Sequence, residues 1–176
     1  MEKKKLQKLV LLLLGVLLLM VLFRQGSYLL LPSEPVALVP GLRYSAGPLG
    51  AVLRLGLPEE IDGHLSDWSK VFYDFEGELD GAPARFRLTF VDGLWLTELS
   101  VRVETENPAR AEALFEAWCE RLDEAYRGAA GCQNQGITES ETGKELHLDI
   151  NKGALGLSCR VTLEGCTVSF YGNNQW

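Results

Sequence analysis

The stretch Val71–Glu104, VFYDFEGELDGAPARFRLTFVDGLWLTELSVRVE, decides the fold that we predict for this chain. Two Asp-Gly pairs, Asp80-Gly81 and Asp92-Gly93, separate three segments in which apolar and polar residues alternate. Asp-Gly between alternating segments is the strongest short-range signal for a two-residue β-hairpin turn. The stretch therefore predicts an antiparallel meander of three strands.

Two-residue turns also predict which residues lie opposite one another. The first turn places Phe75 opposite Phe86, and the second places Phe86 opposite Leu99. One face of the meander is then apolar across all three strands. A slip by one residue would expose Phe86 and its neighbours to water, so the apolar pattern favours this register.

The other face of the meander is charged. The predicted register places Asp74 opposite Arg87, followed by Glu98 on the third strand, and it places Glu76 opposite Arg85. Opposite charges across a strand pair contribute about 0.2–1 kcal/mol each. We expect this face to be either a row of solvated ion pairs or a surface that a partner meets.

A long helix is predicted after the meander. Asn107-Pro108 supplies an N-cap and a first-turn proline, and the helix is expected to run to about Tyr126, before Gly128. One stripe of this helix is apolar: Ala111, Leu114, Phe115, Trp118, Cys119, Leu122, Ala125 and Tyr126. We expect the stripe to cover the apolar face of the meander.

The C-terminal part predicts further strands. Residues 128–143 read as a polar loop, and residues 146–150 alternate as a half-buried strand. A last hairpin is expected from Leu157–Leu163 and Cys166–Tyr171, with a Glu164-Gly165 turn and Val161 opposite Val168. The fold class is therefore α+β: an antiparallel sheet, made of the meander and C-terminal strands, covered by one long helix.

Residues 1–31 predict a membrane segment that precedes this domain. The apolar run Leu9–Phe23 spans about 22 Å as a helix, less than the roughly 30 Å of a bilayer core. A cleaved signal peptide and an uncleaved signal anchor both remain open. The anchor is favoured, because no A-x-A pattern lies near Phe23 and because Lys8 and Arg24 could snorkel. The lysines at 3, 4, 5 and 8 predict a single-pass protein with a cytoplasmic N-terminus and an extracytoplasmic C-terminal domain in the cell membrane.

Residues 32–50, rich in proline and glycine, predict a linker, and residues 51–176 predict the extracytoplasmic α+β domain. Within that domain we expect a short strand at Ala51–Leu55 and a short helix beginning at Pro58.

Charge is divided unevenly along the chain. Residues 1–26 hold five Lys or Arg and one acid, a net +4, and the remainder holds twelve against twenty-three, a net −11, which together give −7. An acidic domain matches the phosphate backbone poorly, so nucleic acid is not expected as a partner. We expect instead the membrane, through the N-terminal helix, and an envelope protein.

Four cysteines, Cys119, Cys132, Cys159 and Cys166, could form disulfides outside the cytoplasm. Three connectivities exist, and a bridge from Cys119 to Cys159 or Cys166 is geometrically reasonable. Buried free thiols are the alternative. No C-x-x-C spacing is present, so a cysteine metal site is not expected.

Two histidines are candidates for chemistry. Glu145, His147 and Asp149 lie on one strand face and are potential metal ligands, although a solvated strand face is the expected interpretation. His64 has acids nearby in sequence but no identifiable nucleophile. We predict no catalytic residue and no cofactor.

The order of elements after Leu55 carries a family resemblance. A helix start, GLPEEI, is followed by YDFEGEL and RFRLTFVDGLW. The chain thereby resembles small bacterial extracytoplasmic proteins, the outer-membrane assembly lipoproteins of the SmpA/OmlA type and related inhibitor-like folds. The resemblance covers about Gly56 to Glu98, and the chain departs from it by lacking a lipid-attachment cysteine. It implies a non-enzymatic protein-binding or envelope-structural role.

These features together predict a membrane-anchored extracytoplasmic protein that binds or scaffolds other envelope components. A metal-binding or hydrolytic domain that uses His147 or His64 is the first alternative. A secreted effector, cleaved from its signal and stabilised by disulfides, is the second.

Overall fold

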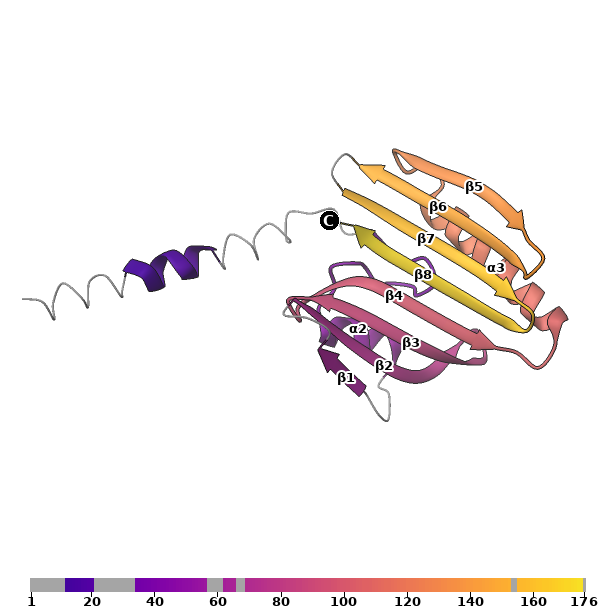
Figure 1. The fold of residues 1–176 in the computed structure, drawn as a ribbon, viewed down its shortest axis with the longest axis horizontal. Helices are drawn as coiled ribbons and strands as arrows, with labels where there is room; N and C mark the ends of the chain where they lie inside the picture. Colours follow the sequence, from indigo (N-terminus) through magenta and orange to yellow (C-terminus); the bar gives the residue numbers. More distant parts are fainter. Residues whose placement is uncertain (1–11, 21–33, 57–61, 66–68, 153–154, 176) are drawn as a thin grey trace, which may run out of the picture. The chain divides into compact units, whose positions relative to one another are not determined.

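The computed structural model describes residues 12–20, 34–56, 62–65, 69–152 and 155–175 (Figure 1). The chain forms two compact units, Met1–Pro32 and Ser33–Trp176. In the first unit the described residues 12–20 are helical, and the rest of the predicted membrane segment lies outside the described residues. None of the helices in the described ranges is long and apolar enough to cross a membrane.

The second unit is an α+β domain built on one antiparallel sheet, as predicted. Within the described residues, eight strands lie in the order β1-β2-β3-β4-β8-β7-β6-β5. Their bounds are β1 Asp62–Leu65, β2 Lys70–Leu79, β3 Ala82–Val91, β4 Trp95–Glu104, β5 Cys132–Glu139, β6 Lys144–Lys152, β7 Leu155–Glu164 and β8 Thr167–Gln175.

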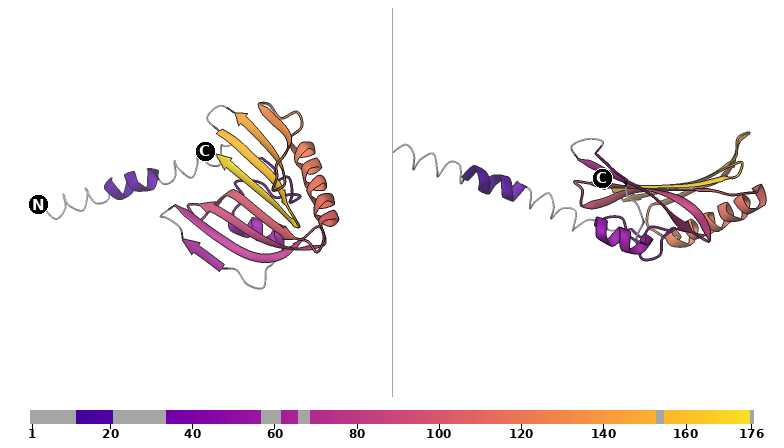
Figure 2. Two further views of the ribbon diagram at one scale, coloured as in Figure 1. Left: turned by 45° about the vertical axis from the view of Figure 1, so that its right-hand side comes forward. Right: turned by 90° about the horizontal axis from the view of Figure 1, so that it is seen from below.

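The sheet consists of two meanders that meet in the middle. Helix α2, Pro48–Leu55, precedes β1 to β4, and helix α3, Pro108–Tyr126, precedes β5 to β8. The last strand of each meander pairs with the other, with Val101 opposite Phe170. Both helices lie on one face of the sheet, and no helix covers the opposite face within the described part of the chain (Figure 2).

Helix α3 begins and ends as predicted. The Asn107 side chain accepts a hydrogen bond of 2.8 Å from the Arg110 backbone N–H, which caps the helix. Its buried stripe includes Phe115, Trp118 and Leu122. The stripe packs mainly on β7 and β8 rather than on the meander β2–β4, so the predicted partner was wrong. The chain leaves β4 at the middle of the sheet and must reach β5 at its far edge, so the helix crosses the C-terminal half.

Residues 34–55 supply the rest of the helix-side layer, which corrects two predictions. Residues 34–50 are not a linker, because their apolar side chains are buried in the core: Val36, Leu38, Val39, Leu42 and Tyr44. The backbone of Ser45 and Ala46 exchanges hydrogen bonds of 2.8 and 2.9 Å with Leu96. Residues 51–55 belong to α2 rather than to a strand, with Pro48 in its first turn.

The predicted register is right for β2 and β3 but wrong for β3 and β4. Phe75 lies opposite Phe86, and Asp80 and Gly81 both have positive φ, as a type I′ turn requires. Phe86 lies opposite Val101 rather than Leu99, because the second turn extends through Leu94 and a bulge lies between Thr89 and Phe90. A shift by two residues leaves every side chain on its face, so alternation could not reveal it.

The last hairpin shows the same kind of shift. Val161 lies opposite Phe170 rather than Val168, because the turn is formed by Gly165 and Cys166. Gly165 adopts a φ of 59°, which suits the first position of a tight hairpin turn.

Two strands lie where none was predicted. Asp62–Leu65 forms β1, the outer neighbour of β2, although a helix was expected there from Pro58; residues 57–61 lie outside the described residues. Cys132–Glu139 forms the edge strand β5 within the predicted polar loop. β5 is exposed along almost its whole length, so it lacks the alternation that marks a half-buried strand.

Asp80 fastens the β2–β3 turn to α3 by accepting a hydrogen bond of 2.8 Å from Trp118 Nε1 and two from Arg121, of 2.9 and 2.7 Å. Burial alone would raise the pKa of the Asp80 carboxyl, but the hydrogen bonds and charge of Arg121 and the bond from Trp118 outweigh it and lower the pKa below its ordinary value.

We expect the Asp80→Asn variant to lose an acid-sensitive part of the stability. A lowered native pKa contributes stability above the unfolded-state pKa of about 3.9, and this contribution disappears as the pH falls through the native pKa. Asn tolerates the positive φ of 55° at this position, so the substitution removes the charge and keeps the turn. Urea denaturation midpoints measured from neutral pH down to about pH 3 should fall less steeply for the variant than for the parent chain. Parallel curves would show that the Asp80 charge adds nothing.

Candidate functional site

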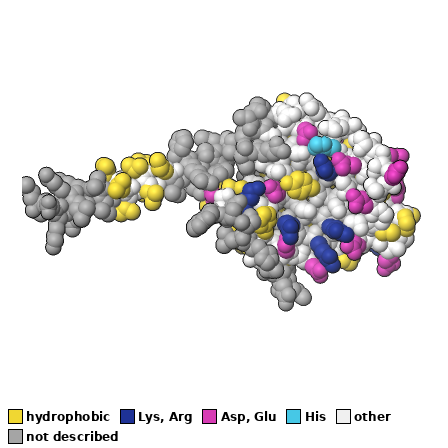
Figure 3. Space-filling model, viewed as in Figure 1, with side chains coloured by type: hydrophobic (Ala, Val, Ile, Leu, Met, Phe, Trp, Pro, Cys, Tyr) yellow, Lys and Arg dark blue, Asp and Glu magenta, His cyan; other side chains and the backbone are white. Residues whose placement is uncertain are grey.

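The face of the sheet without helices, here called the open face, is the candidate site. Alternation along the strands separates the two faces: Phe86 and Leu88 are buried on the helix side, whereas Arg85 and Arg87 are exposed on the open face. Figure 3 shows this face, with acidic and basic side chains interspersed across it. It therefore carries no single sign of charge.

Ion pairs cover the part of the open face over β2 and β3. Arg87 donates two hydrogen bonds of 2.7 Å to Asp74, in the bidentate arrangement that suits guanidinium and carboxylate. Arg85 lies 3.4 Å from Glu76. The structure thus brings together the two cross-strand pairs that the sequence predicts.

Glu98 also lies on the open face, but it is not in the cross-strand row of Asp74 and Arg87. Arg87 faces Ser100 on β4, and Glu98 faces Thr89, because of the shifted β3–β4 register. The Glu98 carboxylate instead accepts a hydrogen bond of 3.3 Å from Lys70 on β2.

Two arginines lie directly opposite each other, Arg85 on β3 and Arg102 on β4. Like charges in this position repel. Each has its own carboxylate, with Arg102 3.2 Å from Glu104, and these four residues line a shallow hollow with a volume of about 280 Å³. Since the arginines are already neutralised, the hollow offers little to an anionic ligand.

Tyr171 occupies the centre of the open face. It lies opposite Ser100 on one side and Arg160 on the other, with 41% of its surface exposed. Partial burial, followed by the nearby Glu98 charge, raises the pKa of its hydroxyl, which hydrogen-bonds to Asn173. The central strand β8, TVSFYGNNQ, carries no charge, so Tyr171 lies in an uncharged polar strip between charged flanks.

The C-terminal flank holds the predicted ladder of Glu145, His147 and Asp149. All three lie on the open face, and Glu145 pairs with Arg160 at 3.3 Å. His147 Nε2 lies 3.2 Å from Asp149 Oδ1 and 3.0 Å from Ser158 Oγ. No group of three His, Cys, Asp or Glu side chains in the described ranges could hold a metal ion.

The His147, Asp149 and Ser158 side chains have the residue types of a serine hydrolase but not its geometry. Catalysis requires the acid on one ring nitrogen and the serine on the other. Here one nitrogen contacts both partners, so Asp149 cannot orient the ring while the other nitrogen takes the serine proton. The other histidine, His64, lies on β1 opposite Phe72, and its side chain lies outside the described part.

All four cysteines are free thiols in this structure, so no disulfide of the predicted set is formed. Burial raises the pKa of both the Cys119 and Cys159 thiols to about 12, assisted at Cys119 by Glu116. Thiols with such pKa values are not ionised near neutral pH and are poor nucleophiles. Cys166 lies in the β7–β8 turn rather than in the strand Cys166–Tyr171 of the predicted hairpin.

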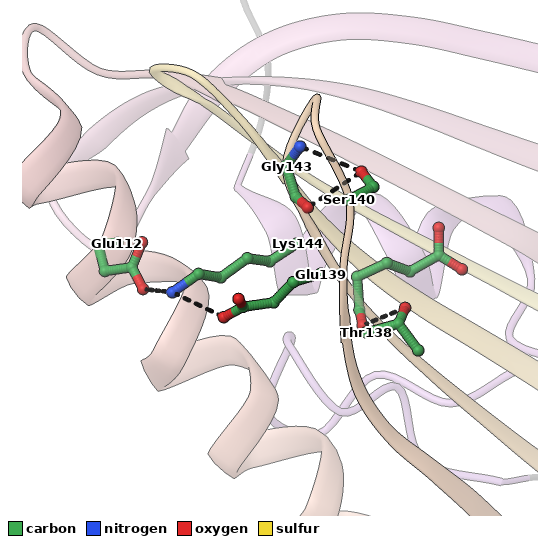
Figure 4. A network of polar contacts seen from close by, with 7 residues as sticks. Glu112, Thr138, Glu139, Ser140, Gly143 and Lys144 are labelled. Atoms are coloured by element: carbon green, nitrogen blue, oxygen red, sulfur yellow. Dashed lines mark hydrogen bonds and ion pairs between the residues drawn. The ribbon is translucent and has the colours of Figure 1, made fainter.

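A second polar cluster joins α3 to the turn between β5 and β6 (Figure 4). Lys144 contacts Glu112 of α3 and lies 3.7 Å from Glu139, and the contact with Glu112 raises the pKa of Lys144. Ser140 and Gly143 close the turn by a backbone hydrogen bond of 2.8 Å. The contacts are internal to the fold and serve to fasten the edge of the sheet to the helix.

Neither a protein-family model, nor a curated protein, nor a solved structure matches the chain.

Sequence reasoning found the charged side chains on β2 and β3 but missed Lys70, Tyr171 and Arg160. Alternation in the last hairpin could have found Tyr171 and Arg160. Tyr171 directly follows the buried Phe170, and Arg160 directly precedes the buried Val161, so both belong to the opposite face. No local signal showed that β4 and β8 are neighbours, and this pairing is what joins the two charged flanks into one surface.

Proposed function

We propose that this chain is a non-enzymatic, membrane-anchored extracytoplasmic protein that presents the open face of its sheet to a protein partner. The observation that carries the proposal is the open face itself, an eight-stranded sheet with helices on one side alone among the described residues. Antiparallel sheets commonly leave one face to water, and such a face is available for binding.

The open face is large enough for a stable complex. Eight strands spaced about 4.8 Å apart, eight to ten residues long except for the four residues of β1, and rising about 3.4 Å per residue, give an area of roughly 1,000 Å². A standard protein–protein interface needs about 800 Å² on each partner.

The composition of the open face favours a protein rather than a charged polymer. Tyrosine and arginine are enriched where proteins bind each other, and Tyr171 lies between Arg160 and the Ser100–Arg87 pair across the centre. The arginines are held by carboxylates, which presents them in fixed positions and leaves little net positive charge. Nucleic acid binding depends on unneutralised positive charge.

The anchor is part of the proposal. The Leu9–Phe23 run and the lysines before it support a single-pass segment within residues 1–31, with the N-terminus in the cytoplasm and the domain outside. Resistance of the full chain to alkaline carbonate extraction from membranes tests the anchor, and an intact N-terminus by mass spectrometry distinguishes it from a cleaved signal peptide. Release by carbonate would contradict it.

Charge reversal at Arg160 tests the partner-binding face. We expect Arg160→Glu to abolish recovery of specific partners when the full chain is purified from native membranes after crosslinking, because the variant places a third negative charge beside Glu145 and Asp149. Arg127→Glu at the C-cap of α3 is the matched control, because it also breaks one exposed pair, with Asp123, but lies on the other side of the sheet. Equal loss in both variants, or loss in neither, would argue against the open face as the binding surface.

A further inference from the structure

The outer side of α2 is an exposed apolar surface. Leu49 and Leu53, four residues apart and hence on one side of the helix, are 72% and 64% exposed. Leu94, in the turn before β4, is 47% exposed and lies beside the start of α2, where a Cβ on Gly47 would be 3.6 Å from the Leu94 carbonyl oxygen. We call these three residues the leucine patch. Exposed apolar patches on folded proteins commonly mark a surface that a membrane or a partner protein covers.

The chain enters the domain on the same side of the sheet as the leucine patch. The Glu34 carbonyl accepts a hydrogen bond of 3.0 Å from the Tyr44 backbone, and the Pro35 carbonyl accepts one from the Tyr126 hydroxyl on α3. Both contacts lie in the helix-side layer. The entering segment also touches α2, since a Cβ on Gly41 would be 3.1 Å from the guanidinium of Arg54, the residue after Leu53.

We propose that the leucine patch rests on the lipid of the membrane to which the chain is anchored, so that the helix side faces the bilayer and the open face points away from it. This inference rests on the proposed anchor. Nine residues, 24–32, separate the apolar run from the domain, and they reach at most about 32 Å when extended. The short tether keeps the patch at high effective concentration near the surface, so a shallow contact is sufficient.

The composition of α2 fits contact with a lipid surface better than contact with a second acidic protein domain. The helix carries no acid, and its one charged residue is Arg54, in the last turn. A short amphipathic helix of this kind inserts its apolar side at the boundary between headgroups and acyl chains. Because the domain as a whole is acidic, we expect the contact to be apolar and independent of anionic lipid.

Photocrosslinking of the full chain in phosphatidylcholine vesicles, with and without phosphatidylglycerol, tests the contact. Benzoylphenylalanine replaces Leu49 or Leu53 in two variants, and Tyr171 on the open face in a control. We expect mass spectrometry to detect lipid adducts at positions 49 and 53 in both vesicle types and no lipid adduct at position 171. Combining the position 49 probe with Leu53→Ser should reduce its lipid adducts, while the melting temperature stays unchanged because both side chains are exposed.

The outcomes separate the patch from the anchor. Carbonate-resistant protein without lipid adducts at 49 and 53 would retain the anchor and overturn the patch. Carbonate-released protein that still gives those adducts would support the patch and overturn the anchor. Protein–protein adducts at 49 or 53 would show that a second copy of the chain covers the leucine patch, and equal lipid labelling at position 171 would remove the proposed orientation.

Discussion

Gly172→Ala is expected to destabilise the domain more than any exposed substitution. Gly172 is buried in β8, opposite Leu99 on one side and Cys159 on the other. A Cβ there would lie 1.9 Å from the Tyr44 hydroxyl oxygen and 2.9 Å from Phe170 Cζ. Overpacking a core costs about 1–3 kcal/mol and occasionally more, and we expect the upper end because Tyr44 is itself completely buried. Chemical denaturation measures the loss.

A double-mutant cycle with Tyr44→Phe tests the stated cause. Removing the hydroxyl creates room for the new methyl group, so the double variant should be more stable than the two separate losses predict. Gly77→Ala in β2 is the control, because its Cβ would lie at a milder 3.2 Å from the Phe86 ring. Additive losses in the cycle would show that Tyr44 is not the obstacle.

Trp118→Ala is expected to cost about 3–5 kcal/mol, the usual range for removing a large buried aromatic side chain. Trp118 is fully buried at the centre of the α3 stripe. Its indole N–H also donates to Asp80, so the variant loses both core packing and one of the bonds that fasten the β2–β3 turn to the helix. A thermal or denaturant unfolding transition measures the effect.

Trp118→Phe separates the two contributions. Phenylalanine restores most of the apolar contact but donates no hydrogen bond, and Asp80 keeps its two bonds from Arg121. We expect this variant to lose clearly less stability than Trp118→Ala. A Trp118→Ala domain that melts with the parent chain would contradict the core assigned to α3.

Gly172→Ala, whose new methyl group meets Tyr44, and Trp118→Ala probe different parts of one helix-side layer. Tyr44 belongs to the segment that was expected to be a linker, and Trp118 belongs to the helix that was expected to cover the meander. Both lie in a single core cluster beneath the sheet. The open face depends on that layer, because packing on the helix side holds β4 and β8 together and keeps Tyr171 in line with its charged neighbours.

Strong local signals in the sequence predicted the elements well. Asp80-Gly81 determines a two-residue turn and the β2–β3 register, and Asn107-Pro108 determines where α3 begins. The weaker signals failed where neighbours in space decide the outcome. The proline and glycine content of residues 34–50 resembles a linker, yet the apolar residues among them are buried by strands far along the chain.

Local periodicity and turn geometry were sufficient to predict the α+β class, the alternation of apolar and charged faces, and the pairs of Asp74 with Arg87 and Glu76 with Arg85. Long-range packing was needed to show that β4 lies against β8, that α3 covers the C-terminal half, and that Tyr171 is the centre of the open face. Pairing between strands distant in sequence depends on which apolar surfaces cover each other, and no local pattern encodes that choice.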